Sequence, residues 1–144
     1  MKVTDLGKYF DSKLNKVKKA HTDALFESVD YIVLWSPVDT GNFRANWQGA
    51  LGGDLPVDEV QWWGNDYEMN RQVTAGVPSY GYSFAMTNIG RLIEMSAGEQ
   101  FDLVNTTDYG GDLESGYSPQ SKAFTAMGFD KYKQLLEAGL KKNK

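Results

Sequence analysis

Apolar residues recur every three or four positions through the first third of the chain, with charged residues between them. This spacing predicts one amphipathic helix from about Asp5 to Trp35. Such a helix is roughly 46 Å long at ~1.5 Å per residue, whereas a compact chain of this length has a diameter of roughly 37 Å. The helix therefore overshoots the domain unless it bends near Gly7 or His21, and an overhanging apolar stripe needs a neighbour. The stripe comprises Leu6, Phe10, Leu14, Val17, Ala20, Ala24, Leu25, Val29, Ile32 and Trp35.

The segment that follows has the composition of a sharp corner. Pro37 disfavours the α conformation in the residue before it and ends the helix. Asp39 and Thr40 have side chains that cap backbone donors, and Gly41 permits a tight reversal. We therefore expect a structural corner and a short helical turn over 42–46, capped from Asp39 or Thr40.

The middle of the chain predicts short elements. Residues 47–51 favour a strand, and 52–56 a loop. Residues 66–76 are compatible with a short helix. Residues 80–88 alternate aromatic or apolar with small side chains, which predicts a half-buried strand. Residues 91–95 are compatible with either a strand or a short helix.

Residues 97–119 are polar and contain several glycines without a helical period, which predicts a long loop. The loop carries five acids and no cation, yet it has large apolar side chains that a solvated linker does not need. We interpret it as a segment that orders against a neighbouring subunit or an adjoining ring. Its candidate interface residues are Phe101, Leu103, Tyr109, Leu113 and Tyr117. Ser121 is expected to cap a final helix.

Composition limits the class of protein. The chain has 144 residues, enough for one domain, of which 41% are hydrophobic and 24% charged. No stretch approaches the ~20 apolar residues of a membrane span, and no secretory h-region is visible. Because cysteine is absent, neither disulfides nor thiolate chemistry are expected, and the cytoplasm of the producing cell is the expected compartment.

Charge is segregated along the chain. Residues 1–19 and 122–144 hold twelve of the fifteen Lys and Arg against four acids, whereas 20–121 has three arginines against fifteen acids. This asymmetry suits a protein that packs copies of itself head to side, or that seats a basic end on an acidic partner. Solvated lysine faces on the two terminal helices explain the pattern equally well.

Reactive groups are sparse. His21 is the single histidine and has no triad context, so a polar residue on a helix face is the favoured interpretation. Residues 108–112 resemble a calcium loop only loosely. Trp62 and Trp63 could stack on bases, but the acids around them favour a core or subunit-interface role. We expect no enzyme activity, no metal and no cofactor.

Three segments resemble a known family. Pro37–Trp47 resembles the Pro-Val-Asp-Thr-Gly-x-x-Arg-x-(Ser or Asn)-(aromatic) element that follows the first helix in neck and tail-completion proteins of tailed bacteriophages. Residues 86–96 are similar to that family's Thr-Asn and Arg-Leu-x-Glu elements, with Met95 and Ser96 where Tyr and Gly are usual. Residues 118–127 are comparable to its entry into the last helix, with the proline displaced and the glycine absent.

The resemblance implies an α+β fold, with a long N-terminal helix and a C-terminal helix packed on a small antiparallel sheet. It also implies a homo-oligomeric ring in the virion neck, joining the portal side to the tail, with adjacent neck, portal-side and tail proteins as partners and DNA free to pass through. Assembly is then expected in the host cytoplasm. No catalytic residues are carried over. Asp39, Thr40, Gly41 and Arg44 match position by position and are expected to fix the direction of the chain after the long helix.

Several alternatives stay open at this point. The ring could be a tail-completion protein, a tail terminator or a head-closure protein. A nucleic-acid-binding module would need the terminal lysines on one accessible face, and sequence-specific recognition is poorly supported because the lysine run at 13–19 lacks interleaved aromatics. A small hydrolase would need acids clustered in a pocket.

Overall fold

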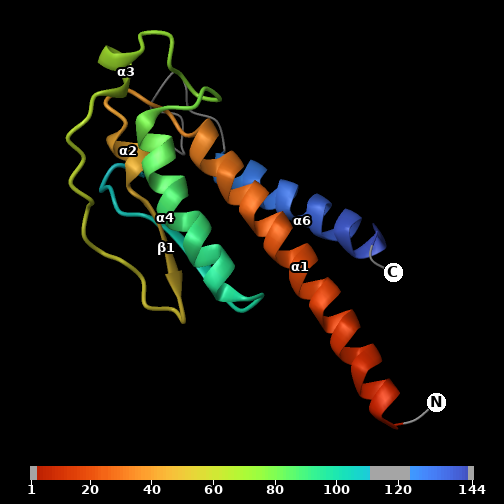
Figure 1. Ribbon diagram of the computed structural model, residues 1–144. Coiled ribbons are helices and arrows are strands. Elements are labelled where there is room, and N and C mark those ends of the chain that lie inside the picture. Colours follow the sequence, from red (N-terminus) through yellow and green to blue (C-terminus); the bar gives the residue numbers. More distant parts are fainter. Residues whose placement is uncertain (1–2, 111–123, 143–144) are drawn as a thin grey trace.

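The structure, a computed structural model, describes residues 3–110 and 124–142. Two long terminal helices and a two-stranded antiparallel sheet give the α+β fold that the sequence predicted (Figure 1). The elements in chain order are α1 (Val3–Trp35), α2 (Asn42–Ala45), β1 (Trp47–Leu51), α3 (Asp66–Met69), α4 (Tyr80–Ser96), β2 (Phe101–Asn105) and α6 (Phe124–Lys142).

Helix α1 is a single helix of 33 residues, as the periodic pattern predicted. Figure 1 shows it running without a sharp bend past the end of the other elements. Its buried positions begin at Ala20, which is 4% exposed, and continue through Val33, which is fully buried. The part of α1 before residue 18 therefore projects from the body of the protein.

The corner forms at the predicted place, and α2 occupies most of the expected turn. The N-cap residue is Gly41, which has no side chain to offer, so the predicted cap is wrong for Asp39 and is limited for Thr40 to one hydrogen bond with the first residue of α2. Gly41 has φ 92°, in the left-handed region that favours glycine. Thr40 contributes only locally, since its Oγ1 accepts a 3.3 Å hydrogen bond from the Asn42 N–H.

The sheet is a single antiparallel pair. Strand β1 pairs with β2 so that Trp47 lies opposite Asn105 and Leu51 lies opposite Phe101. The strand predicted over 47–51 is confirmed. The loop predicted over 97–119 is wrong for Phe101–Asn105, which forms β2, because pairing with β1 satisfies the backbone of this short segment. Residues 111–119, which include Leu113 and Tyr117, lie outside the described residues.

Helix α4 occupies the stretch for which a strand was predicted over 80–88. Ser79 caps it by accepting a 3.2 Å hydrogen bond from the Tyr82 N–H. The strand prediction took the alternating aromatic side chains as the buried face of a strand, and it is wrong because Tyr80 is 64% exposed. The side chains that α4 buries follow the helical spacing and are Gly81, Ala85, Met86, Ile89, Ile93 and Ser96.

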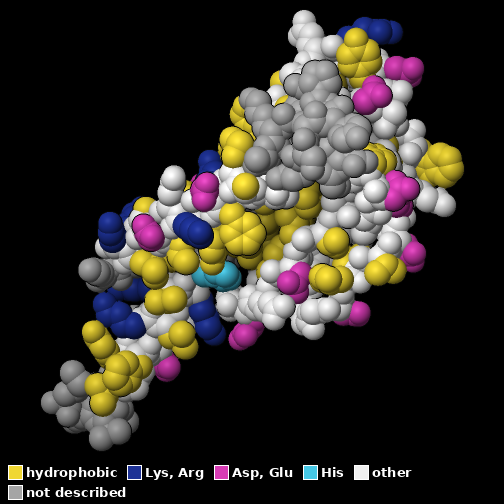
Figure 2. All heavy atoms as spheres, turned by 180° about the vertical axis from the view of Figure 1, so that it is seen from behind, with side chains coloured by type: hydrophobic (Ala, Val, Ile, Leu, Met, Phe, Trp, Pro, Cys, Tyr) yellow, Lys and Arg dark blue, Asp and Glu magenta, His cyan; other side chains and the backbone are white. Residues whose placement is uncertain are grey.

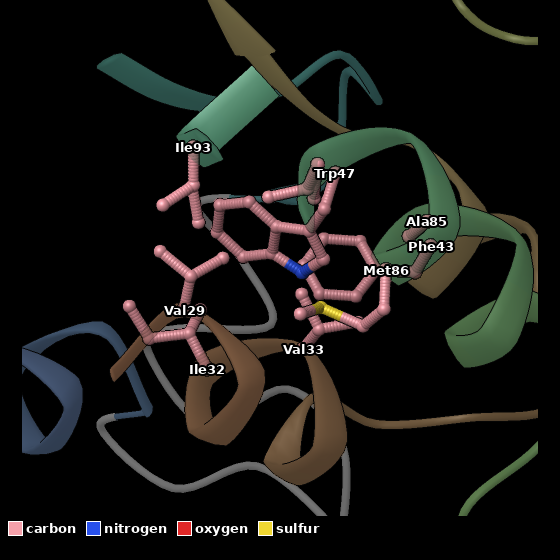
Figure 3. Close-up of a cluster of buried hydrophobic side chains, with 9 residues drawn as sticks. Val29, Ile32, Val33, Phe43, Trp47, Ala85, Met86 and Ile93 are labelled. Carbon is pink, nitrogen blue, oxygen red and sulfur yellow. The ribbon is translucent and has the colours of Figure 1, made fainter. Parts of the chain in front are cut away.

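The core lies where α1, α4 and β1 meet. Trp47 at the start of β1 sits among side chains from both helices, and Figure 3 shows its indole ring beside Val29, Ile93 and Met86. The Trp47 Nε1–H donates a 2.9 Å hydrogen bond to the Ser36 hydroxyl, so the polar end of the ring is also satisfied. The corner sequence thereby supplies the centre of the core directly.

Helix α6 packs along α1 in the opposite direction. Gly128 lies against Ile32 and Gly139, three residues before the end of α6, lies against Ala20. The His21 ring and the Tyr132 hydroxyl meet between the two helices at 2.6 Å, which agrees with the helix-face role expected for His21. Ser121, the predicted cap of this helix, lies outside the described residues.

Candidate functional site

Arg44 is the most deeply buried charge of the corner, with no exposed surface. All five of its N–H donors find oxygen acceptors, four of which are backbone carbonyls. These bonds join the end of α1 to the segment that precedes α4. The acceptors are the carbonyls of Leu34 (2.7 Å), Ser36 (3.0 Å), Thr74 (3.0 Å) and Val77 (2.6 Å) and the hydroxyl of Ser79 (3.1 Å).

The charge on Arg44 persists despite its burial. Loss of solvation lowers the pKa of Arg44 to about 10, while the nearby groups Asp66 and Tyr82 oppose that shift. The guanidinium is therefore still protonated at neutral pH. Since four of its donors hold backbone carbonyls and the fifth holds the Ser79 hydroxyl, Arg44 has no free donor for a ligand and acts as a structural clamp.

A second set of contacts holds the outside of the corner. The Thr40 carbonyl accepts hydrogen bonds from the Trp62 indole (2.7 Å) and from the Asp66 backbone (2.9 Å). The buried Asp66 carboxylate accepts from the Gly81 N–H at 3.1 Å, in the first turn of α4, where the helix dipole favours a negative charge. Asp39 is exposed, and its carbonyl accepts from the Tyr67 N–H. The corner is thus fixed mainly through its backbone.

We expect Gly41→Ala to destabilise the fold by about 3 kcal/mol. The left-handed backbone costs a residue with a Cβ about 1–2 kcal/mol, and a Cβ at this position would also overlap the Asp66 carboxylate. Gly52→Ala is the matched control, since Gly52 also has a positive φ (68°) but no atom within 4 Å of the added Cβ. Urea unfolding of both variants measures the difference; equal losses would show that the overlap does not matter.

Asn46 joins the corner to the sheet. It is fully buried, and its Oδ1 accepts from the Val60 N–H (2.6 Å) and the Thr106 hydroxyl (2.8 Å) while its amide donates to the Asn42 carbonyl (2.8 Å). The resemblance placed an Asn or Ser here, but the sequence alone did not assign it these partners. Its role is visible only once the segments at 60 and 106 are placed beside it.

The candidate interface residues divide into three groups. Phe101 and Leu103 lie in β2 and pack against the core cluster. Tyr109 is 37% exposed, its ring lies 6.0 Å from that of Phe43 at a tilt of 36°, and its hydroxyl accepts a 3.1 Å hydrogen bond from the Asn42 side chain. Burial raises the pKa of Tyr109 above its usual value. Leu113 and Tyr117 lie outside the described residues, so the structure places only three of the five.

The projecting part of α1, residues 6–17, is hereafter the arm. Its apolar residues at spacings of four, four and three lie on one face, and Figure 2 shows them beside lysines at the narrow end of the molecule. Their exposed fractions are large for such side chains: Leu6 41%, Phe10 60%, Leu14 52% and Val17 48%. The polar face of the same helix carries Lys8, Asp11, Ser12, Asn15 and Lys16.

An apolar cleft of about 390 Å³ lies between α1, α6 and the sheet. Figure 2 shows the hollow with hydrophobic side chains on its walls. Its lining residues include Val29 and Ile32 of α1, Phe101, Asp102 and Leu103 of β2, and Phe129 and Tyr132 of α6. Phe129 is 67% exposed at the rim. Two of the residues predicted to form an interface therefore stand in the wall of an open cleft.

Groups for chemistry are few in the part of the chain that the structure describes. No set of three or more His, Cys, Asp or Glu side chains is close enough there to hold a metal ion. Trp62 is held by the Thr40 carbonyl, while Trp63 is 88% exposed, so only the first of the two tryptophans packs into the fold. Within residues 3–110 and 124–142, no helix has the length and hydrophobicity of a membrane span.

Comparisons with protein-family models, with curated proteins and with solved structures find no match to this chain. The functional interpretation therefore rests on the residues themselves: a corner closed by Arg44, an uncovered apolar arm, and an open apolar cleft.

Proposed function

We propose that this protein is a structural component of a bacteriophage virion and forms a homo-oligomeric ring in the neck, between the portal complex and the tail. The observation that carries the proposal is the arm, whose apolar side chains Leu6, Phe10, Leu14 and Val17 are between 41% and 60% exposed. A soluble monomer gains nothing from a projecting apolar helix, and large exposed apolar patches mark interaction sites.

The corner supports the same proposal from a different direction. The segment Pro37–Trp47 resembles the corner of neck and tail-completion proteins, and its side chains close the fold rather than face a ligand. The N–H donors of Arg44 bind four carbonyl oxygens and the Ser79 hydroxyl, and the Trp47 side chain packs in the core. A chain whose most distinctive motif is structural, and whose exposed apolar surface is a helix, suits an assembly role without catalysis.

A ring also suits the distribution of charge. The arm carries three lysines and one aspartate, whereas residues 20–110 carry three arginines and thirteen acids. Head-to-tail contacts join unlike surfaces and close into rings, whereas a twofold contact joins like surfaces. Opposite charges on different parts of one chain favour the first arrangement. Tail-completion, tail-terminator and head-closure rings all fit these observations.

Localisation in particles tests the proposal. An antibody to this chain should label the junction of head and tail in particles purified from the producing cell, and the label should remain after the particles are washed in high salt. Recovery of the chain only in the soluble fraction of such cells, with none in the particles, contradicts the proposal.

A nucleic-acid-binding role is the alternative, because Lys8, Lys16 and Lys19 border one shallow polar hollow on α1. Two features weaken it. Asp11 borders the same hollow, and Lys19 is paired at 2.6 Å with Asp23. With so few free cations, duplex DNA binding should be lost at physiological salt. Retention on a DNA column at that salt would favour the alternative.

A further inference from the structure

We propose that the arm of one subunit docks in the apolar cleft of the next copy of this chain. This inference rests on the proposed ring and identifies its interface. Within residues 3–110 and 124–142, the structure provides an exposed apolar helix face and an open apolar cleft on different parts of the molecule. Matching them between copies gives a head-to-tail contact, which is the kind that a ring requires.

The two surfaces cannot meet within one chain. The arm and the floor of the cleft belong to the same continuous helix, because Val29 and Ile32 lie on α1 beyond the arm. A rigid helix cannot fold its first turns back onto its own last turns, and Figure 1 shows α1 leading directly away from the sheet. A second copy is therefore the natural source of the missing partner.

The chemistry of the two surfaces is complementary. Leu6, Phe10, Leu14 and Val17 present apolar groups at positions i, i+4, i+8 and i+11, the spacing by which an amphipathic helix binds a hydrophobic groove. The cleft offers aromatic walls from Phe101, Phe129 and Tyr132. The arm therefore offers an apolar helix face, and the cleft offers an apolar groove that could hold such a face.

Charge decides between docking in the cleft and pairing of two arms. Two arms side by side would bring together Lys8, Lys13 and Lys16 of one copy with the same lysines of the other, and like charges across an interface are unfavourable. The cleft has Asp102 of β2 among its lining residues, while its α6 wall belongs to the lysine-rich end of the chain. An arm whose lysines face the β2 side of the cleft therefore meets an acidic side chain rather than like charges.

Photo-crosslinking of the full chain tests this contact. A benzophenone side chain is placed at Phe10 on the apolar face of the arm, with Asn15 on its polar face as the control position. Isotope-labelled and unlabelled copies are mixed under conditions of assembly, so that links between chains are recognised by mass. We expect links between copies from position 10 to β2 and α6. We expect no such links from position 15.

The other outcomes decide against the inference. Links between copies from position 10 to residues 6–17 would show that arms pair with each other. Links to any third surface, or assembled rings without links from position 10, would overturn the inference and leave the ring intact. Absence of assembly at every concentration, and in the presence of purified virion components, would overturn both.

A substitution in the cleft gives an independent measurement. Phe129→Asp should weaken self-association about thirtyfold if the Phe129 side chain is a central anchor of the interface. The fold should survive because this side chain is 67% exposed. Met69→Asp in α3 is the matched control, at 59% exposed and away from the cleft. Equal dissociation constants for the two variants would contradict the proposed contact.

Discussion

Arg44→Met is expected to destabilise the protein by about 3–5 kcal/mol, a large share of the 5–15 kcal/mol that stabilises a typical domain. Methionine fills a similar volume but donates no hydrogen bond. The carbonyls of Ser36 and Val77 would lose the donors that Arg44 supplies. Those of Leu34 and Thr74 would each lose one of two donors and keep the backbone N–H of Gly76 or Val77. Each buried acceptor left unpaired costs about 1–3 kcal/mol before the structure relaxes.

Two companion variants make the result specific to the clamp. Arg44→Lys keeps the charge but offers three donors where five are used, so its loss of stability should lie between those of the parent and the methionine variant. Arg91→Met removes an exposed arginine and should change stability by less than about 0.5 kcal/mol. Urea unfolding monitored by circular dichroism measures all three. A parental midpoint for Arg44→Met would show that the carbonyls do not need this side chain.

The double variant Phe10→Gln, Leu14→Gln is expected to abolish self-association while leaving the folded subunit intact. Both side chains lie on the arm and are more than half exposed in the isolated chain, so their loss removes little packing. Glutamine is a good helix former and preserves α1. If each side chain is an anchor worth about 2 kcal/mol, each substitution weakens association about thirtyfold.

The matched control carries the same new residues on the other face of the arm. Ser12→Gln, Asn15→Gln changes two exposed positions on the polar side of α1 and should assemble like the parent. Sedimentation velocity over a range of concentrations gives the association constants, and thermal unfolding checks the fold. Loss of assembly in both double variants would point to a general effect on the arm rather than to its apolar face.

The sequence predicted the elements whose signals are local. Periodic apolar residues place α1, and Pro37 marks its end, because both act through the backbone of neighbouring residues. Strand β1 was also predicted, and Gly41 was assigned to the reversal that its φ of 92° now explains. These features need no knowledge of the rest of the fold.

Elements that depend on distant partners were predicted poorly. Strand β2 exists because β1 offers it an edge, and nothing within the polar stretch 97–110 indicates that edge. In α4 the exposed aromatics Tyr80 and Phe84 suggested an alternating strand, whereas the buried residues follow a helical period that overlaps them. Tertiary burial, which the sequence does not display, decided both cases.

The residues that form the corner were predicted from the sequence, but most of their hydrogen-bond partners were not. Asp39, Thr40, Gly41 and Arg44 were singled out together, and the structure places all four at the corner. Of the expected side-chain caps only the hydrogen bond from the Asn42 N–H to the Thr40 hydroxyl forms, and the other contacts of the corner are made by backbone carbonyls that accept from Trp62, Asp66 and Arg44. The partners of these carbonyls lie twenty or more residues away in several cases, beyond the reach of a local signal.

The number and arrangement of copies in the assembled particle test the proposed ring most directly. Native mass spectrometry of necks released from virions gives the copy number, and electron microscopy of the same necks gives the symmetry. We predict more than two copies of this chain in a closed ring with head-to-tail contacts around a central passage. A particle that contains only one or two copies of this chain would contradict the proposed function.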